Sequence, residues 1–316
     1  MSVKAPHQPV SQSGILPDSS SHARFLVLRL GSLSIDELKA QLLALEETRQ
    51  RLNTQYVNSK LSSVVGFGLE LWTKLYKEVP QGFHDLAPLS SISQAEKLIM
   101  PSTGGDLVIH IHGEQADLCF LLAQTFMNGI ADKVQVLDEQ TGFRYLDRRD
   151  LTGFIDGTEN PFSEDDRAEA ALLGEGQFEG GSFVFSQRFV HDLQTWQRLK
   201  VDAQEHVFGR TKLESIEFPD GVKRTNSHTA RVVIEDDQGE ELEILRHSLP
   251  YGNGSGEQGL FFQAYTKDLS IIDRMLARMY GVGDGITDRM LHFVTPVSGA
   301  YFFAPSQDLL DEIIEG

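Results

Sequence analysis

In the first half of the chain, segments in which hydrophobic residues recur at every second position alternate with segments in which they recur at every third or fourth position. Alternation with a period of two, or a short apolar run, predicts strands over residues 25–30, 61–69, 106–112 and 133–138. Apolar residues spaced three or four apart predict helices after a Ser34–Glu37 capping box, where Leu38 and Leu42 begin the stripe, and over 114–132. The order is β-α-β-β-α-β, which is the ferredoxin-like unit.

The second half shows the same two patterns in shorter pieces. Strand patterns occupy 182–190, 231–235, 242–245, 259–265 and 300–303. Helical patterns occupy 193–199, 203–207 and the segment that carries Ile271, Met275 and Met279. The sequence has no detectable internal repeat, so a second unit of the same kind is an architectural inference. We expect an α+β protein with an N-terminal arm (1–21), a first half (22–150) that includes a long connection (80–102), and a second half (151–316).

Composition limits the class of protein. The 316 residues are 40% hydrophobic and 23% charged, as in ordinary globular proteins, and the net charge is -18. This charge argues against binding to nucleic acid or to an anionic membrane surface. No apolar stretch approaches about 18 residues and no secretory signal is visible, so we expect a cytoplasmic protein. The single cysteine, Cys119, lies in an apolar run and is expected to be a buried hydrophobe.

His110 and His112 lie two residues apart on a predicted strand and therefore point to one face. Two such histidines could bind a metal ion, but no third ligand follows at a suitable spacing. We interpret them as polar residues of the strand face.

Residues 151–162, LTGFIDGTENPF, form the stretch with the clearest chemical content. Asp156 stands between Gly153 and Gly157, and glycines allow positive φ angles and the close approach of a ligand. The Asn160–Pro161 pair prevents the segment from continuing as a helix or central strand. Taken alone, Asp-Gly indicates an ordinary hairpin turn with a solvated carboxylate.

Three separated motifs change this interpretation: GFIDGTENP around Asp156, SHTAR around His228, and ILRHSLPYG around Arg246. Together they resemble the dye-decolourising peroxidases, in particular the type B, cytoplasmic bacterial subgroup, over about residues 14–309. The resemblance implies two ferredoxin-like halves of the dimeric α+β barrel type, and one haem b per chain in the second half. It also implies hydrogen peroxide and small reductants, such as dyes or phenols, as substrates, and a homo-oligomer, dimeric or higher.

On the proximal side, the resemblance assigns His228 as the axial ligand of the haem iron. Without it, a lone histidine before an apolar segment is more often a hydrogen-bonded structural residue. An axial histidine usually donates its second N–H to an acceptor. Matched spacing points to Glu241, with Asp236 and Asp237 as rivals.

On the distal side, the resemblance assigns Asp156 and Arg246 to peroxide chemistry. A guanidinium stays charged and can stabilise the charge that develops as the O–O bond breaks. In isolation, a strand-end arginine is more often a structural ion pair. Some family members have Asn where this chain has Ser248, which leaves the role of that position open. His247 should face the opposite side of the strand.

Other residues would surround the haem. The resemblance assigns Arg210 to a propionate, although a surface arginine is an equal alternative. The backbone N–H groups of Gly157 and Thr158 would lie at the haem edge. Apolar residues of the 259–265 strand would form the distal wall: Leu260, Phe261 and Phe262. Trp196 and Tyr251 are candidate electron relays, each with a structural alternative.

The mechanism that the resemblance implies begins with peroxide bound trans to His228. Asp156 would move the proton between the peroxide oxygens while Arg246 stabilises the departing charge, and reductants would then reduce a ferryl-oxo porphyrin radical. An ordinary Asp titrates near 3.9, so activity should be highest at acidic pH unless burial raises that pKa. Two rivals are a haem-binding, iron-releasing (deferrochelatase-like) protein and a ferredoxin-like oligomer without cofactor.

Overall fold

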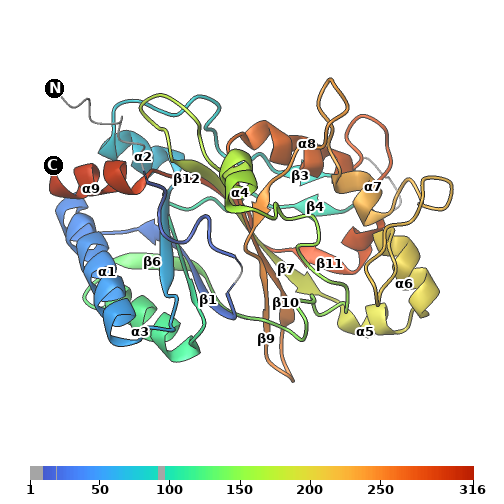
Figure 1. Ribbon diagram of the computed structural model, residues 1–316, viewed down its shortest axis with the longest axis horizontal. Coiled ribbons are helices and arrows are strands. Elements are labelled where there is room, and N and C mark those ends of the chain that lie inside the picture. Colours follow the sequence, from blue (N-terminus) through green and yellow to red (C-terminus); the bar gives the residue numbers. More distant parts are fainter. Residues whose placement is uncertain (1–9, 19, 92–96) are drawn as a thin grey trace.

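The computed structural model describes residues 10–18, 20–91 and 97–316. In the N-terminal half, four antiparallel strands pair in the order β2-β5-β1-β6. These strands are β1 (His22–Leu30), β2 (Ser62–Phe67), β5 (Leu107–Gly113) and β6 (Val134–Phe143). Helices α1 (Ile35–Gln55) and α3 (Ala116–Met127) pack side by side on their outer face (Figure 1). The ferredoxin-like order predicted for this half is confirmed.

The patterns that predicted α1 are present in the structure. Ser34 and Glu37 form the capping box, and the apolar stripe that begins with Leu38 is buried. The long connection contains two short pairs of strand residues, β3 (Leu89–Ser90) and β4 (Ile99–Met100), and follows helix α2 (Leu69–Leu75). Cys119 is buried on α3, and burial raises the pKa of its thiol to about 12.

The C-terminal half repeats the arrangement, with strands in the order β9-β10-β7-β12. Its strands are β7 (Ser182–His191), β8 (Leu245–Arg246), β9 (Leu249–Gly252), β10 (Gln258–Thr266), β11 (Val294–Pro296) and β12 (Ala300–Ala304). Its helices are α4 (Glu164–Ala171), α5 (Leu193–Gln197), α6 (Val201–Phe208), α7 (His228–Val232), α8 (Leu269–Met279), the 3₁₀ helix η1 (Arg289–His292) and α9 (Gln307–Glu315).

Two predicted strands are wrong, since only Leu245 of residues 242–245 lies in a strand, β8. Residues 231–235 do not form a strand, because Arg231 and Val232 end the short helix α7. The Arg231 guanidinium donates to the backbone oxygen of Arg278 and pairs with Asp284. These contacts hold α7 against the end of α8. An extended segment would not place the Arg231 guanidinium to make them.

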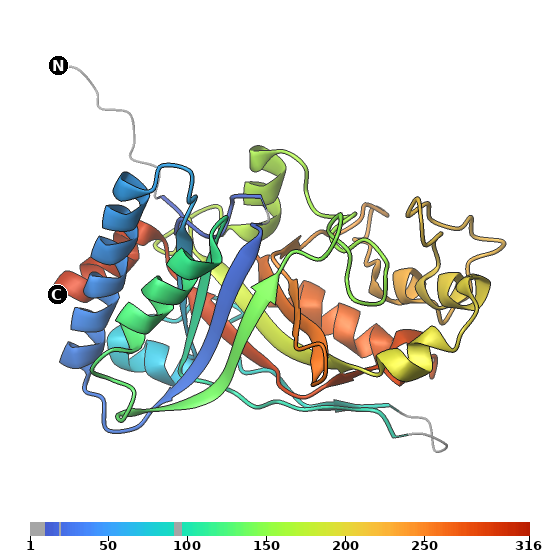
Figure 2. The same cartoon turned by 90° about the horizontal axis from the view of Figure 1, so that it is seen from below.

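The two halves join into one closed ring of strands, because β7 pairs with β10 as well as with β12. Figure 2 shows the strands of the two halves side by side. β6 meets β9 at the pair Gly142–Tyr251, and β12 meets β2 at the pair Phe303–Phe67. Because strand side chains alternate between faces, each strand has one row inside the barrel and one row beneath the outer helices. Inside the barrel, Phe25 stacks on Phe261 with ring centroids 4.3 Å apart.

The arm expected over residues 1–21 is wrong for residues 10–18, 20 and 21, which pack against the barrel, whereas residues 1–9 and 19 lie outside the described part of the chain. Ile15 is fully buried, and the Gln12 amide bonds the backbone of Val65 and Pro305. Gln12 thereby satisfies polar groups of two neighbouring segments. In the described residues, no helix combines the length and apolar character that crossing a bilayer requires.

Candidate active site

A large apolar cavity lies in the C-terminal half, between the outer face of β7 and β10 and helices α7 and α8. It encloses about 1370 Å³, its open mouth included. The sheet contributes Phe185, Gln187, Phe189, His191, Leu260 and Phe262 to its wall, and α8 contributes Ile272, Met275, Leu276 and Met279. The predicted wall residues Leu260 and Phe262 are therefore on the cavity, whereas Phe261 points into the barrel because it lies between them on β10.

His228 is the first residue of α7 and lines this cavity. Its Nδ1 lies 2.7 Å from Oδ2 of Asp288, whose side chain is fully buried. The other carboxylate oxygen of Asp288 accepts the Met290 N–H at 2.8 Å. An imidazole whose Nδ1–H donates to a carboxylate has its Nε2 lone pair available to a metal ion.

The prediction that Glu241 accepts the hydrogen bond from His228 is wrong, because Asp288 is the acceptor in the structure. Glu241 lines the same cavity but is exposed and pairs through its backbone with Glu235. The rival Asp236 accepts N–H groups within its own turn. Asp288 lies 60 residues after His228, and no local sequence signal joins them.

Asp156 lies on the loop between β6 and α4. Gly153 and Gly157 adopt φ angles of +89° and +80°, which L residues rarely adopt. The Asp156 N–H donates to the Arg148 carbonyl at 2.9 Å, which fixes the turn. Burial raises the pKa of the Asp156 carboxyl, and the nearby charge of Arg246 opposes that shift.

Arg246 is held by Asn160, a residue that sequence analysis treated only as part of a turn. The Asn160 Oδ1 accepts the Arg246 backbone N–H at 3.0 Å and its Nε–H at 3.3 Å. The Asn160 amide donates to the Arg246 carbonyl at 2.8 Å. This two-way contact fastens the loop to β8, and so places Asp156 and Arg246 on the wall of one cavity.

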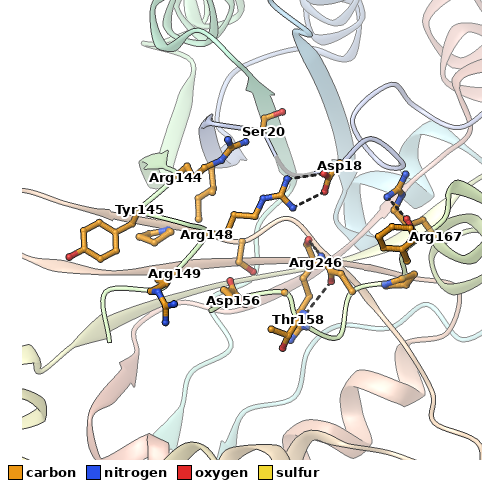
Figure 3. Close-up of a pocket in the computed structure, with 17 residues that line it drawn as sticks. Asp18, Ser20, Arg144, Tyr145, Arg148, Arg149, Asp156, Thr158, Arg167 and Arg246 are labelled. Carbon is orange, nitrogen blue, oxygen red and sulfur yellow. Dashed lines mark hydrogen bonds and ion pairs between the residues drawn. The ribbon is translucent and has the colours of Figure 1, made fainter. Parts of the chain in front are cut away.

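A second, polar pocket borders the same loop (Figure 3). This vestibule is lined by Asp18, Ser20, Arg144, Tyr145, Arg148, Arg149, residues 156–158, residues 160–162, Arg167, Arg246 and residues 248–250. Asp156 and Arg246 line both the vestibule and the apolar cavity. Gly157, Thr158 and Ser248 line the vestibule alone. The two shared side chains therefore stand between a polar entrance and an apolar chamber.

Arg210 does not lie on the wall of the apolar cavity. Its guanidinium donates to the Thr158 hydroxyl, to Glu159 at 2.6 Å and to Glu217 at 3.2 Å. Arg210 is buried, and its contacts hold the residues that follow Asp156 on the loop.

Three buried polar atoms on the cavity wall make no hydrogen bond among the described residues: Gln187 Nε2, and the pair Asp150 Oδ1 and His191 Nδ1, which lie 3.6 Å from each other. Buried polar groups normally have partners, so the Gln187 amide nitrogen indicates a ligand with a polar group at its edge. The available imidazole nitrogen indicates a metal centre, and the surrounding walls are apolar. A large, mostly apolar group with one metal ion, such as haem, fits this combination.

The other candidate residues lie away from the cavity wall. Trp196 is buried and donates to the Thr152 carbonyl. Tyr251 is also buried, with its hydroxyl near Arg188 and Glu257. His247 faces the barrel interior, on the side of β8 away from Arg246, as predicted.

The chain is similar to known proteins over nearly its whole length. The family models described as "Dyp-type peroxidase, N-terminal" and "Dyp-type peroxidase, C-terminal" match residues 12–144 and 147–309. A dye-decolorizing peroxidase of Mycobacterium tuberculosis is 39% identical, with 96% of this chain and 90% of the relative covered.

Two solved structures extend the similarity to three dimensions. A dye-decolorizing protein from V. cholerae is 42% identical, with a TM-score of 0.89 and coverage of 96% of this chain and 99% of that one. A variant of DypB from Rhodococcus jostii, solved in complex with heme, is 37% identical, with a TM-score of 0.87 and the same coverage.

Proposed function

Because the chain belongs to the dye-decolourising peroxidase family, and is a haem-dependent peroxidase, we propose that it works through His228, Asp156 and Arg246. The observation that carries this assignment is the pair formed by His228 and the buried Asp288. It leaves one imidazole nitrogen for iron in a cavity whose wall also carries a carboxylate and a guanidinium.

His228 would hold the haem iron, and Asp288 would orient the imidazole and increase its basicity. The apolar walls, including Leu260 and Phe262, would cover the porphyrin faces and exclude water. Bound haem supplies the redox-active iron and porphyrin that exchange electrons with peroxide and reductant.

Asp156 would act on the proton of hydrogen peroxide. Its carboxylate accepts a proton from one peroxide oxygen and returns it to the other as that oxygen leaves. Arg246, which Asn160 holds in place, donates hydrogen bonds to the oxygen that gains charge. Burial raises the pKa of Asp156, which makes the carboxylate a stronger base than an exposed one.

The haem edge would meet the backbone N–H groups of Gly157 and Thr158. Arg210 supports these residues through the Thr158 hydroxyl and Glu159, so we assign it to positioning the loop. Ser248 would hold water in the vestibule; its hydroxyl oxygen accepts the Gln263 N–H at 3.3 Å.

Hydrogen peroxide and small reducing molecules are the substrates of this family, and we propose a cytoplasmic homo-oligomer for this chain. A deferrochelatase-like function gains no support from the site. A protein that only binds haem needs neither the Arg246 guanidinium that Asn160 holds nor the Asp156 carboxylate that lines both pockets. The haem-bound relative also speaks against an oligomer without cofactor.

Substitution of the distal residues tests the assignment. In Asp156→Asn and Arg246→Leu, the haem absorption band should be retained, while the rapid reaction with peroxide in a stopped-flow instrument should slow strongly. His228→Ala should lose the normal haem spectrum. Exposed Arg198→Leu removes the same charge as Arg246→Leu and should behave as the native protein. Native rates in both distal variants would contradict the proposed roles.

A further inference from the structure

A buried tyrosine and a buried histidine are hydrogen-bonded inside the barrel, away from the cavity. The Tyr265 hydroxyl lies 2.8 Å from Nδ1 of His110. The exposed fractions of the two residues are 0% and 1%. Neither residue has a role in the peroxide chemistry proposed above.

Neighbouring groups set the direction of this hydrogen bond. The Gln263 amide nitrogen donates to the Tyr265 oxygen at 3.4 Å, and the Gln263 carbonyl oxygen accepts from the Ser186 hydroxyl at 2.6 Å. The Tyr265 oxygen thus already accepts a hydrogen bond, so its own proton points to His110. His110 Nδ1 is then the acceptor, and its Nε2 carries the ring proton.

The interior keeps both partners uncharged at rest. Burial raises the pKa of Tyr265, whereas burial and the neighbouring His112 and His247 hold the pKa of His110 well below its usual value. The pair is therefore a phenol that donates to a neutral imidazole. Among the described residues, His110 Nε2 has no hydrogen-bond partner, which is costly in a dry interior. A pair that served only to satisfy buried polar groups would not leave one of them unsatisfied.

The pair lies directly behind the distal wall of the cavity. Tyr265 and Ala264 of β10 are paired with Leu245 and Arg246 of β8. Leu260 and Phe262 of the same strand face the cavity, and Tyr265 faces the barrel. A single layer of sheet therefore separates Tyr265 from the cavity that fits haem.

We propose that Tyr265 is a redox-active tyrosine that stores one oxidising equivalent, with His110 as its proton acceptor. Once peroxide has oxidised bound haem, Tyr265 would supply one electron to it. The phenolic O–H bond breaks as a bond forms between that proton and His110 Nδ1. The products are a neutral tyrosyl radical, an imidazolium and a cofactor reduced by one electron. An electron from a reductant, with return of the proton, restores the pair.

The barrel interior is suited to both products. The oxidised phenol is a strong acid, so His110 can accept its proton even with a lowered pKa. Phe25 stacks on the His110 ring with centroids 4.8 Å apart and an interplanar angle of 8°, which places an aromatic face against the imidazolium. Because Tyr265 is fully buried, external molecules cannot reach and quench its radical by direct contact.

Electron paramagnetic resonance of the freeze-quenched holoenzyme tests the proposal. Peroxide is added without reductant, and the tyrosyl radical is quantified against total haem. The signal should be present in the native enzyme and lost in Tyr265→Phe. The matched control is Tyr280→Phe, which removes a hydroxyl from a residue equally buried beside α8. The Tyr280 hydroxyl makes no hydrogen bond to a described residue, so this variant should retain the signal.

A second variant tests the proton acceptor independently of Tyr265. His110→Leu should abolish the radical, or shift the high-field g value that reports a hydrogen bond to the phenoxyl oxygen. The proposal is overturned if the native enzyme forms no tyrosyl radical, if Tyr265→Phe retains it, or if His110→Leu leaves its yield and g values unchanged.

The proposal depends on the peroxidase function, and the same samples distinguish the two. A protein that does not bind haem or consume peroxide would contradict the peroxidase function. A protein that consumes peroxide but forms no Tyr265 radical would contradict only the present inference.

Discussion

Replacement of Asp288 by Asn tests the proximal half of the site most directly. Asp288 is fully buried and accepts the His228 Nδ1–H at 2.7 Å. Asn has nearly the same shape, so the change removes the negative charge and leaves the packing nearly unchanged. A hydrogen bond to a charged group contributes about 1.5–3 kcal/mol. Loss of such a partner of a metal ligand lowers metal affinity about 10–100-fold. We therefore expect haem affinity to fall by that factor in Asp288→Asn.

The same substitution should change the reduction potential of the iron and lower the free energy of unfolding only moderately. Without the carboxylate, the imidazole of His228 is a weaker base, so the reduction potential of the iron should rise. The Met290 N–H, which Asp288 Oδ1 accepts at 2.8 Å, can still bond an amide oxygen. The loss in unfolding free energy should therefore come from the weakened contact with His228 and stay within about 1.5–3 kcal/mol.

Haem affinity is measured by titration of the apoprotein with hemin and by the rate of haem transfer to apomyoglobin. Glu241→Gln is the matched control, because Glu241 lines the same cavity without contacting His228. It should leave both quantities near their native values. The reasoning is refuted if Asp288→Asn retains native affinity and potential, or if Glu241→Gln reproduces the loss.

Three further predictions concern the distal wall and the barrel. Asn160→Ala removes the contacts that hold Arg246. It should lower the stopped-flow rate constant with peroxide about fivefold for each net hydrogen bond of about 1 kcal/mol that is lost, while haem affinity stays near native. Because its folded pKa is raised, Asp156 binds more protons in the native state, and stability falls as pH rises above about 3.9. Asp156→Asn should therefore increase the melting temperature at pH 7, and the gain should vanish at acidic pH; an equal gain at all pH values would contradict this. Burial lowers the pKa of His112 to about 4 and of His247 to about 3, so the unfolded chain binds more protons than the folded chain below about pH 6.5. The free energy of unfolding should therefore fall as pH falls, by roughly 3 kcal/mol for His112 alone, and denaturant titrations measure this loss. A flatter acid slope in His112→Leu would confirm the assignment.

The sequence predicted most of the first half because its signals are local. The Ser34–Glu37 capping box and the leucine stripe it precedes depend on residues three or four apart, and the structure has both. The segment 231–235 misled the prediction because β-branched residues suggest a strand. Tertiary contacts of Arg231 stabilise the helix instead.

The site was predictable where its residues lie within motifs, and not where distant segments meet. Asp156, His228 and Arg246 were found through short strings of sequence, and the structure places all three on one cavity. Asp288 was missed because its link to His228 depends on how the chain folds after α8. Asn160 could be recognised as a turn residue, but its hydrogen bonds to Arg246, 86 residues later in the chain, could not be predicted.

The short strand pairing between the two halves of the barrel has a consequence for local unfolding. Each half has long strand pairs, whereas the strand pairing between the halves is confined, among the described residues, to Gly142–Tyr251 and Phe303–Phe67. Side chains inside the barrel, such as Phe25 on Phe261, also join the halves. Amides along these two seams should exchange with deuterium at lower opening free energy than those of β1 or β7. Local opening of the protein would then begin at these two seams, before the strand pairs within either half separate.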